Sequence, residues 1–253
     1  MPAAVLMYHG VERPLDPANL RYTVSEAELR EHVGVLARGD VLAPADLHRA
    51  TSRNGVVLTF DDGEASVLSL AAPILAEREL PAILFMTSGF LGQSGYLDAA
   101  GLRELDDLGF TVGAHGATHR FLNTLPIREL DEELAGARKK LEDVVGRPVT
   151  DLSLPGGRGG RAVTERARAA GYDTIYTSIP GWNGPRMDRL AIRRTAVRRG
   201  MSLELVQRLM RCDPVAHARD VAKMSSRGLI RKLVGEDRYH RFTSLIFSAL
   251  ERR

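Results

Sequence analysis

The chain of 253 residues is long enough for one large domain, and its 44% apolar and 26% charged residues are typical of a soluble protein with a sizeable core. The formal net charge of +3 is small, and arginine and lysine become dense only from Arg186 onward. A single cysteine, Cys212, excludes an internal disulfide and fits a reducing compartment. No apolar run approaches the ~20 residues of a membrane span, and no signal peptide is visible, so we expect a cytoplasmic protein.

Buried strands are expected to alternate with amphipathic helices along most of the chain. The expected strands cover residues 3–8, 55–60, 81–87, 110–114, 149–154, 172–178 and 190–197. The expected helices cover residues 25–36, 65–78, 98–108, 126–145, 162–170 and 202–210. Ser25 and Glu28 resemble a capping box at the first helix. The alternation, with near-continuously apolar strands, predicts an α/β fold in which a parallel sheet forms a closed or nearly closed barrel.

The pattern changes to helices alone from about Pro214. The expected helices at 221–234 and 239–250 carry Lys and Arg on one side and Leu, Ile and Phe on the other. We interpret residues 201–253 as a basic helical extension that packs on a barrel formed by residues 1–200. The alternative is peripheral membrane association, in which these helices contact anionic lipid or an acidic partner.

Two adjacent carboxylates follow the strand at 55–60. This apolar, β-branched run stops abruptly on Asp61, Asp62 and Gly63, as expected of a buried strand that delivers acids to its carboxyl end. Neighbouring carboxylates are costly to bury, because each disfavours ionisation of the other unless a cation or hydrogen bonds offset the repulsion. The pair indicates a metal site, an acid/base task or both. The alternative is a solvated Asp-Asp-Gly turn.

Two histidines, His115 and His119, follow the strand at 110–114. If this segment is a helical turn, both imidazoles face one side and can share a cation. Both the acids and the histidines would then lie at the carboxyl-end rim where barrels keep their active sites. One aspartate oxygen and two imidazole nitrogens suit Zn²⁺, and the second aspartate is free to act as a base. The alternative is an incidental histidine pair.

A Thr-Phe-Asp-Asp-Gly motif followed by His-x-x-x-His resembles the polysaccharide deacetylase family, also called carbohydrate esterase family four or the NodB-homology family. The likeness covers about residues 1–200. It implies a distorted (β/α) barrel of about seven parallel strands and removal of an N-acetyl group from amino sugars. It also implies that Asp61 is the general base and that Asp62, His115 and His119 bind a divalent metal, expected to be Zn²⁺.

The third motif of this family is present only in part, as Leu-Pro-Gly-Gly-Arg with Pro155, Gly156 and Gly157 at its centre. The proline is expected to face the substrate, and an N–H of either glycine would stabilise the tetrahedral oxyanion. The motif's usual arginine and tyrosine are absent, so the base needs a charge partner from elsewhere. Arg194 is our candidate; alternation in a strand places it and Arg193 on opposite faces, so at most one of them points into the barrel. The alternative is two solvated arginines.

The family's last motif, a Leu-x-His that supplies the general acid, is absent, and His217 and His240 lie in the helical tail. However, the Leu-Met-Tyr-His sequence ending at His9 resembles the opening strand of a permuted branch that includes the poly-N-acetylglucosamine deacetylases. This implies that His9 protonates the leaving amine, and the alternative is a buried or turn histidine. Trp182 and Asn183 are expected in a sugar-facing wall, since an aromatic face packs well on a pyranose ring.

These features predict a metal-dependent N-deacetylase, a hydrolase of carbon–nitrogen bonds other than peptide bonds. We expect its partner to be an N-acetyl amino sugar or a glycoconjugate, with no nucleic acid. One alternative is hydrolysis of another amide, such as a cyclic imide or ureide, by the same residues. A second alternative is a non-catalytic sugar-binding protein. The altered third motif and the missing last motif suggest it.

Overall fold

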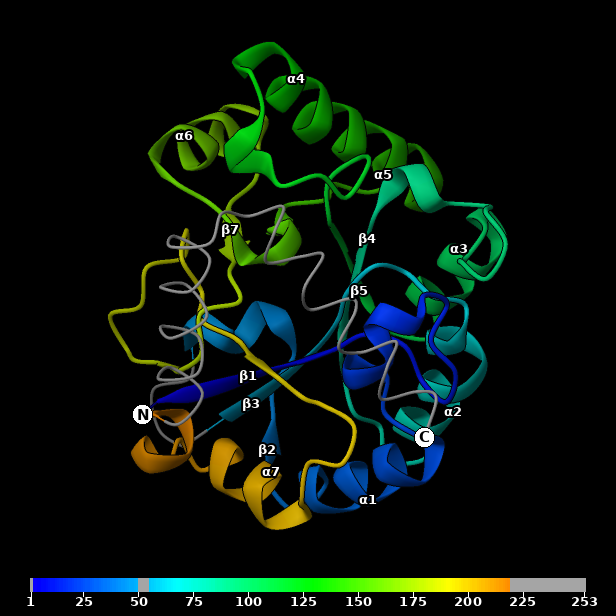
Figure 1. Ribbon diagram of the computed structural model, residues 1–253, viewed down its shortest axis with the longest axis vertical. Coiled ribbons are helices and arrows are strands. Elements are labelled where there is room, and N and C mark those ends of the chain that lie inside the picture. The colour runs from blue at the N-terminus through cyan, green and yellow to red at the C-terminus, as the bar shows by residue number, and fades with distance from the viewer. Residues whose placement is uncertain (1, 50–54, 219–253) are drawn as a thin grey trace.

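The structure is a computed structural model that describes residues 2–49 and 55–218 (Figure 1). Its sheet follows the order β7-β6-β5-β4-β3-β1-β8, with β2 beside β3 and β9 beside β1. The strands are β1 (Ala3–Tyr8), β2 (Asp40–Val41), β3 (Gly55–Phe60), β4 (Ile83–Met86), β5 (Thr111–Ala114), β6 (Asp151–Ser153), β7 (Thr174–Tyr176), β8 (Trp182–Asn183) and β9 (Thr195–Ala196). Only β8 pairs antiparallel among them. The predicted distorted (β/α) barrel is confirmed.

Helices surround the curled sheet in Figure 1. They are α1 (Glu26–Leu36), α2 (Ala72–Ala76), α3 (Ala99–Asp107), α4 (Ile127–Asp131), α5 (Ala137–Val145), α6 (Arg161–Ala169) and α7 (Leu203–Met210). A π-helical turn at Val67–Ala71 leads into α2, and a second at Glu132–Gly136 joins α4 to α5. The helices predicted at 65–78 and 126–145 are therefore each one helical segment with a π-turn. The helices predicted at 221–234 and 239–250 lie outside the described residues.

Side chains along β1 and β3 alternate between two hydrophobic layers. Val5 and Val57 belong to the core inside the barrel, whereas Leu58 belongs to the core between the sheet and the helices. Because the side-chain period of a strand is two, the inward rows continue to His9 beyond β1 and to Asp61 beyond β3. The strands thus aim both residues at the same rim.

The segment that closes the barrel is less regular than the strand predicted at 190–197. Ile192 bridges in parallel to Tyr176 of β7, and β9 pairs in parallel with β1. The segment therefore passes from β7 to β1, but it is strand only at Thr195–Ala196. Within it Arg194 is fully buried and Arg193 is exposed, as alternation requires.

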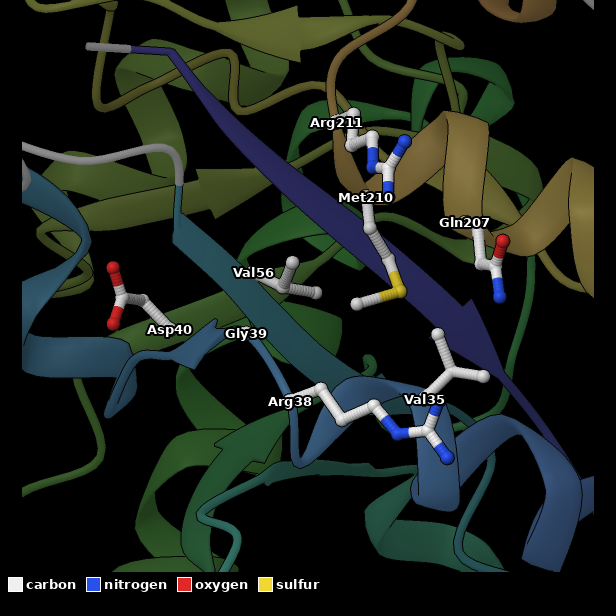
Figure 2. Close-up of a pocket in the computed structure, with 8 residues that line it drawn as sticks. All are labelled: Val35, Arg38, Gly39, Asp40, Val56, Gln207, Met210 and Arg211. Carbon is white, nitrogen blue, oxygen red and sulfur yellow. The ribbon is translucent and has the colours of Figure 1, made fainter.

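Helix α7 packs beside α1, and Val206 and Leu209 join the core between sheet and helices. Figure 2 shows a pocket near this contact, where the side chain of Met210, the last residue of α7, lies between Val56 of β3 and Val35 of α1. Val56 is near the amino end of β3, so this pocket lies at the opposite end of the strand from Asp61. Within the described ranges no helix is long and apolar enough to cross a membrane.

The capping box at α1 is confirmed and yields a stability prediction. Ser25 Oγ accepts the N–H of Glu28 at 3.1 Å, and Glu28 Oε2 accepts the N–H of Ser25 at 2.7 Å. Ser25→Ala should lower the free energy of unfolding by about 1 kcal/mol, because it leaves a helix N–H without its acceptor. Urea denaturation measures this. The exposed Ser94→Ala is the control, and equal effects of the two variants would contradict the assignment.

Candidate active site

Polar side chains from three strand ends converge at one rim of the barrel. Asp61 and Asp62 follow β3, His115 follows β5, and His9 follows β1. Asp62, His115 and His119 each present one donor atom, and these atoms lie within 4.8 Å of one another. The structure therefore brings together the three residues for which the sequence suggested a metal, and it does so at the carboxyl-end rim.

The donor atoms of this group suit a cation. Asp62 Oδ1 lies 3.4 Å from His115 Nε2 and 3.2 Å from His119 Nε2. His115 Nδ1 lies 2.9 Å from the carbonyl of Ser153, and because a carbonyl only accepts, Nδ1 carries the hydrogen and Nε2 offers its lone pair. Asp62 Oδ1 is buried and has no well-aligned hydrogen bond to any described residue. Lone pairs that face one another in this way fit a shared metal ion.

The two histidines do not lie on a helical turn, which was the condition under which both imidazoles would face one side. The segment from His115 to His119 is a loop in which Gly116 has φ 74° and His119 has φ 61°. Glu133, buried in the π-turn between α4 and α5, holds this loop. Its Oε2 accepts the N–H groups of Ala117 and Thr118 at 2.7 and 2.9 Å, and its Oε1 accepts the Thr118 hydroxyl. A carboxylate, rather than helical spacing, therefore sets the distance between the imidazoles.

Asp61 forms a buried ion pair with Arg194. Arg194 Nη1 and Nη2 lie 2.7 and 2.8 Å from the two carboxylate oxygens, a bidentate arrangement. The guanidinium also donates to Ser153 Oγ at 2.6 Å, to Thr59 Oγ1 at 3.1 Å and to the Thr177 carbonyl at 2.9 Å. The structure thus places Arg194 where the sequence sought a charge partner for Asp61.

The environment of Asp61 keeps it ionised. Burial alone would raise the pKa of this carboxyl, but the Arg194 guanidinium, with a smaller contribution from His115, holds the pKa below its usual range. The guanidinium itself lies over the Phe85 and Tyr176 rings, 5.3 and 6.0 Å from their centroids. A buried carboxylate that is charged at neutral pH can accept a proton.

His9 lies at the edge of this group. Its ring is 5.2 Å from that of Tyr22, and its Nδ1 is buried with no hydrogen-bond partner among the described residues. Burial lowers the pKa of His9, while the charges of Asp62 and Asp61 oppose this shift. His9 therefore shares the electrostatic environment of the two aspartates.

The loop after β6 carries the partial third motif. Pro155 is buried, and the Gly157 N–H donates to the Leu154 carbonyl at 2.7 Å. The expectation that the Gly157 N–H could stabilise the oxyanion is therefore corrected, because this N–H already donates to a carbonyl. Gly156 is exposed with φ 61°, and a Cβ there would press on the Phe121 ring at 2.6 Å, so only glycine fits.

Trp182 and Asn183 do not lie near the aspartates, which corrects the expected sugar-facing wall. They form β8, which pairs with Ala3 and Ala4 at the amino end of β1, whereas His9 follows its carboxyl end. The Asn183 side chain hydrogen-bonds the backbone of Arg193 in both directions. Asn183 therefore holds the closing segment at the end of the barrel opposite to the aspartates.

A family model described as polysaccharide deacetylase matches residues 48–175, just over half of the chain. The chain belongs to the polysaccharide deacetylase family. Membership makes it a carbohydrate deacetylase, a hydrolase of carbon–nitrogen bonds other than peptide bonds. YxkH of Bacillus subtilis, which carries the name of a polysaccharide deacetylase, is 28% identical over 206 residues, covering 78% of this chain and 72% of YxkH.

Solved structures of similar proteins share the fold. The Streptococcus pyogenes deacetylase PplD, in complex with acetate, has a TM-score of 0.76 and 21% identity, covering 83% of this chain and 98% of PplD. IcaB from Ammonifex degensii has a TM-score of 0.70 and 23% identity, covering 83% of this chain and 97% of IcaB. At these identities the likeness concerns the barrel itself.

Three residues of this polysaccharide deacetylase site were not found from the sequence. Thr59 could have been, because it precedes Asp61 by two residues and shares its inward row. Ser153 contacts Arg194 and Asp61 across the barrel, and Glu133 reaches the histidine loop from another helix. Neither Ser153 nor Glu133 has a local sequence signal, since its role depends on which elements are neighbours in space.

The histidine loop should depend on Glu133. Glu133→Ala removes the acceptor for two backbone N–H groups, so we expect metal affinity to fall about 10- to 100-fold, as for other residues that orient metal ligands. Titration of the metal-free protein with Zn²⁺ measures this. Glu132→Ala, at the exposed neighbouring position, is the matched control. Unchanged Zn²⁺ affinity in Glu133→Ala would show that the conformation of the histidine loop does not depend on Glu133.

The ion pair should make the stability of Arg194→Met, unlike that of the wild type, fall as pH rises from 5 to 7.5. The wild-type Asp61 carboxylate, with its lowered pKa, contributes stability at neutral pH that is lost as pH falls through its folded-state pKa. In Arg194→Met burial is unopposed by the guanidinium and raises this pKa. That variant should therefore lose about 3–5 kcal/mol at pH 7.5, and the deficit should shrink toward pH 5 as Asp61 protonates.

Urea denaturation of both metal-free proteins at the two pH values provides the measurement. Arg193→Met, one residue away on the exposed face, is the control and should stay within about 1 kcal/mol of wild type at both pH values. A deficit in Arg194→Met that does not change with pH would contradict the linkage to Asp61.

Proposed function

We propose that the chain is a metal-dependent N-deacetylase that removes the acetyl group from an N-acetylated amino sugar, either a saccharide or a glycoconjugate. The observation that carries this proposal is the separation of two adjacent carboxylates into different tasks. Asp62 faces two imidazole nitrogens, whereas Asp61 is paired with Arg194 and stays charged. A ligand set beside an ionised base is an arrangement that suits metal-assisted amide hydrolysis.

The residues divide the reaction between them. Asp62, His115 and His119 would hold a divalent cation, expected to be Zn²⁺, whose chemistry is to acidify water and polarise the amide carbonyl. Asp61 accepts the proton of the attacking water, and Arg194 keeps that carboxylate charged and oriented. The exposed Gly156 presents its backbone toward the developing oxyanion. His9 donates a proton to the leaving nitrogen.

The sugar is proposed to bind between aromatic side chains at this rim. Tyr22 lies against His9, and on the other side the Phe90 ring is 6.0 Å from His119 and 4.6 Å from the Tyr96 ring. All three aromatic residues are partly exposed. We propose that these partly exposed rings pack on a pyranose ring, which is the task that the sequence had assigned to Trp182.

Acetate release from the Zn²⁺-loaded chain tests the proposed function. The panel contains N-acetyl amino sugars, their oligosaccharides, nucleotide sugars and a cyclic imide. We expect acetate from at least one acetylated sugar and no hydrolysis of the imide. Asp61→Asn should lower kcat by about 10²–10⁴ while metal content stays at one ion per chain, because it removes proton transfer and spares the ligands.

His119→Ala is the complementary variant and should lose the metal and the activity together. Hydrolysis of the imide without acetate release from any sugar would instead favour the alternative, an enzyme that hydrolyses cyclic imides or ureides. Full activity in Asp61→Asn would refute the assignment of the base.

A further inference from the structure

Glu64 is a buried carboxylate next to the active-site acids that the proposed reaction does not use. It is 2% exposed, and its Oε2 lies 3.4 Å from Ser66 Oγ. Among the described residues no arginine or lysine pairs with it, and it does not belong to the metal-ligand group of Asp62, His115 and His119. A buried carboxylate outside the metal group requires a structural or functional reason.

The Glu64 carboxylate lies directly against the residue that follows His9. A Cβ on Gly10 would overlap the carboxylate, and the backbone of Gly10 is not in the left-handed region, so a larger residue here would force the Glu64 carboxylate or the loop to shift. The next N–H, of Val11, donates to Ser66 Oγ at 3.0 Å. Glu64 therefore contacts Gly10, and Ser66 binds Val11. These are the two residues that follow His9 at the end of β1.

The backbone of Glu64 is itself fixed independently of His9. Glu64 bridges to Tyr96, and the flanking bonds run from the Ala65 N–H to the Gly95 carbonyl at 2.9 Å and from the Leu97 N–H to the Gly63 carbonyl at 3.0 Å. The Glu64 carboxylate therefore extends from a backbone that is fixed in the turn following Asp62, and its hydrogen bond is to Ser66 Oγ. It joins that turn to the loop bearing His9.

We propose that Glu64 is a positioning residue for His9. Its carboxylate, bonded to Ser66, sets the path of Gly10 and Val11 and so places the imidazole at the leaving nitrogen. This inference rests on the proposed function, in which His9 is the general acid. A displacement of about 1 Å at a catalytic group can cost about 100-fold in rate, so a support of this kind is measurable.

Substrates with different leaving groups isolate the effect on His9. Glu64→Ala should lower kcat for the acetylated amino sugar about 10- to 100-fold with little change in KM or metal content. Hydrolysis of 4-nitrophenyl acetate should stay near wild type, because its leaving phenolate needs no proton. Glu64→Gln keeps the shape and an acceptor for Ser66 and should restore most of kcat. The exposed Glu104→Ala is the control.

A second pair of variants tests the contact itself. Gly10→Ala should lower kcat for the sugar amide at least tenfold, since its methyl group overlaps the Glu64 carboxylate and disturbs the contact between that carboxylate and the loop. The double variant Gly10→Ala/Glu64→Ala relieves this overlap and should be no slower than either single variant. Additive losses in the double variant would overturn the proposal, as would equal losses on the amide and the ester in Glu64→Ala.

Hydrogen exchange at the Val11 amide separates this inference from the proposed function. Exchange should rise at least tenfold in Glu64→Ala and not in Glu104→Ala, whether or not any substrate is cleaved. If the wild type releases no acetate, the proposed function fails, and the exchange result alone decides whether Glu64 orders the loop. Unchanged exchange at Val11 would overturn the role of Glu64.

Discussion

The ion pair between Asp61 and Arg194 is the constraint on which the rest of the site depends. Removing two charges from water costs several kcal/mol per ion, which their attraction offsets only where geometry is good and the remaining donors are satisfied. Here the guanidinium is bidentate to the carboxylate, and Ser153, Thr59 and Thr177 accept its other hydrogens. These partners come from β3, from β6 and from beyond β7, so the pair is satisfied only when the barrel closes.

The same requirement explains why the closing segment is irregular. A regular strand at 190–197 would bond to both neighbours along its whole length. Instead the segment pairs with β7 at Ile192 and with β1 at β9, and between these points Arg194 donates its N–H to the Ile179 carbonyl at 3.1 Å. The closing segment therefore lacks regular strand pairing around Arg194. This irregularity lets the long Arg194 side chain enter the barrel above the Phe85 and Tyr176 rings.

The sequence was informative wherever a role follows from local pattern. The alternation of strands and helices, the capping box and the acids at a strand end depend on periodicity and neighbours in the chain, and the structure agrees with each of them. The pattern was misleading for the histidines, because four-residue spacing suggests a helix whereas Glu133 holds a loop. It failed for Trp182, because an aromatic residue after a strand gives no sign that its short strand runs antiparallel at the opposite end of β1.

The order of strands in space explains how residues from both ends of the chain can complete one site. The family match covers residues 48–175, and so includes the candidate metal ligands Asp62, His115 and His119 but neither His9 nor Arg194. In the sheet, β1 lies between β3 and β9, in parallel with both. Whatever their order in the chain, strands in those three places deliver His9, Asp61 and Arg194 to the same end of the barrel. The site therefore depends on strand adjacency, and β1 brings His9 to this rim although His9 is distant from Asp61 and Arg194 in the sequence.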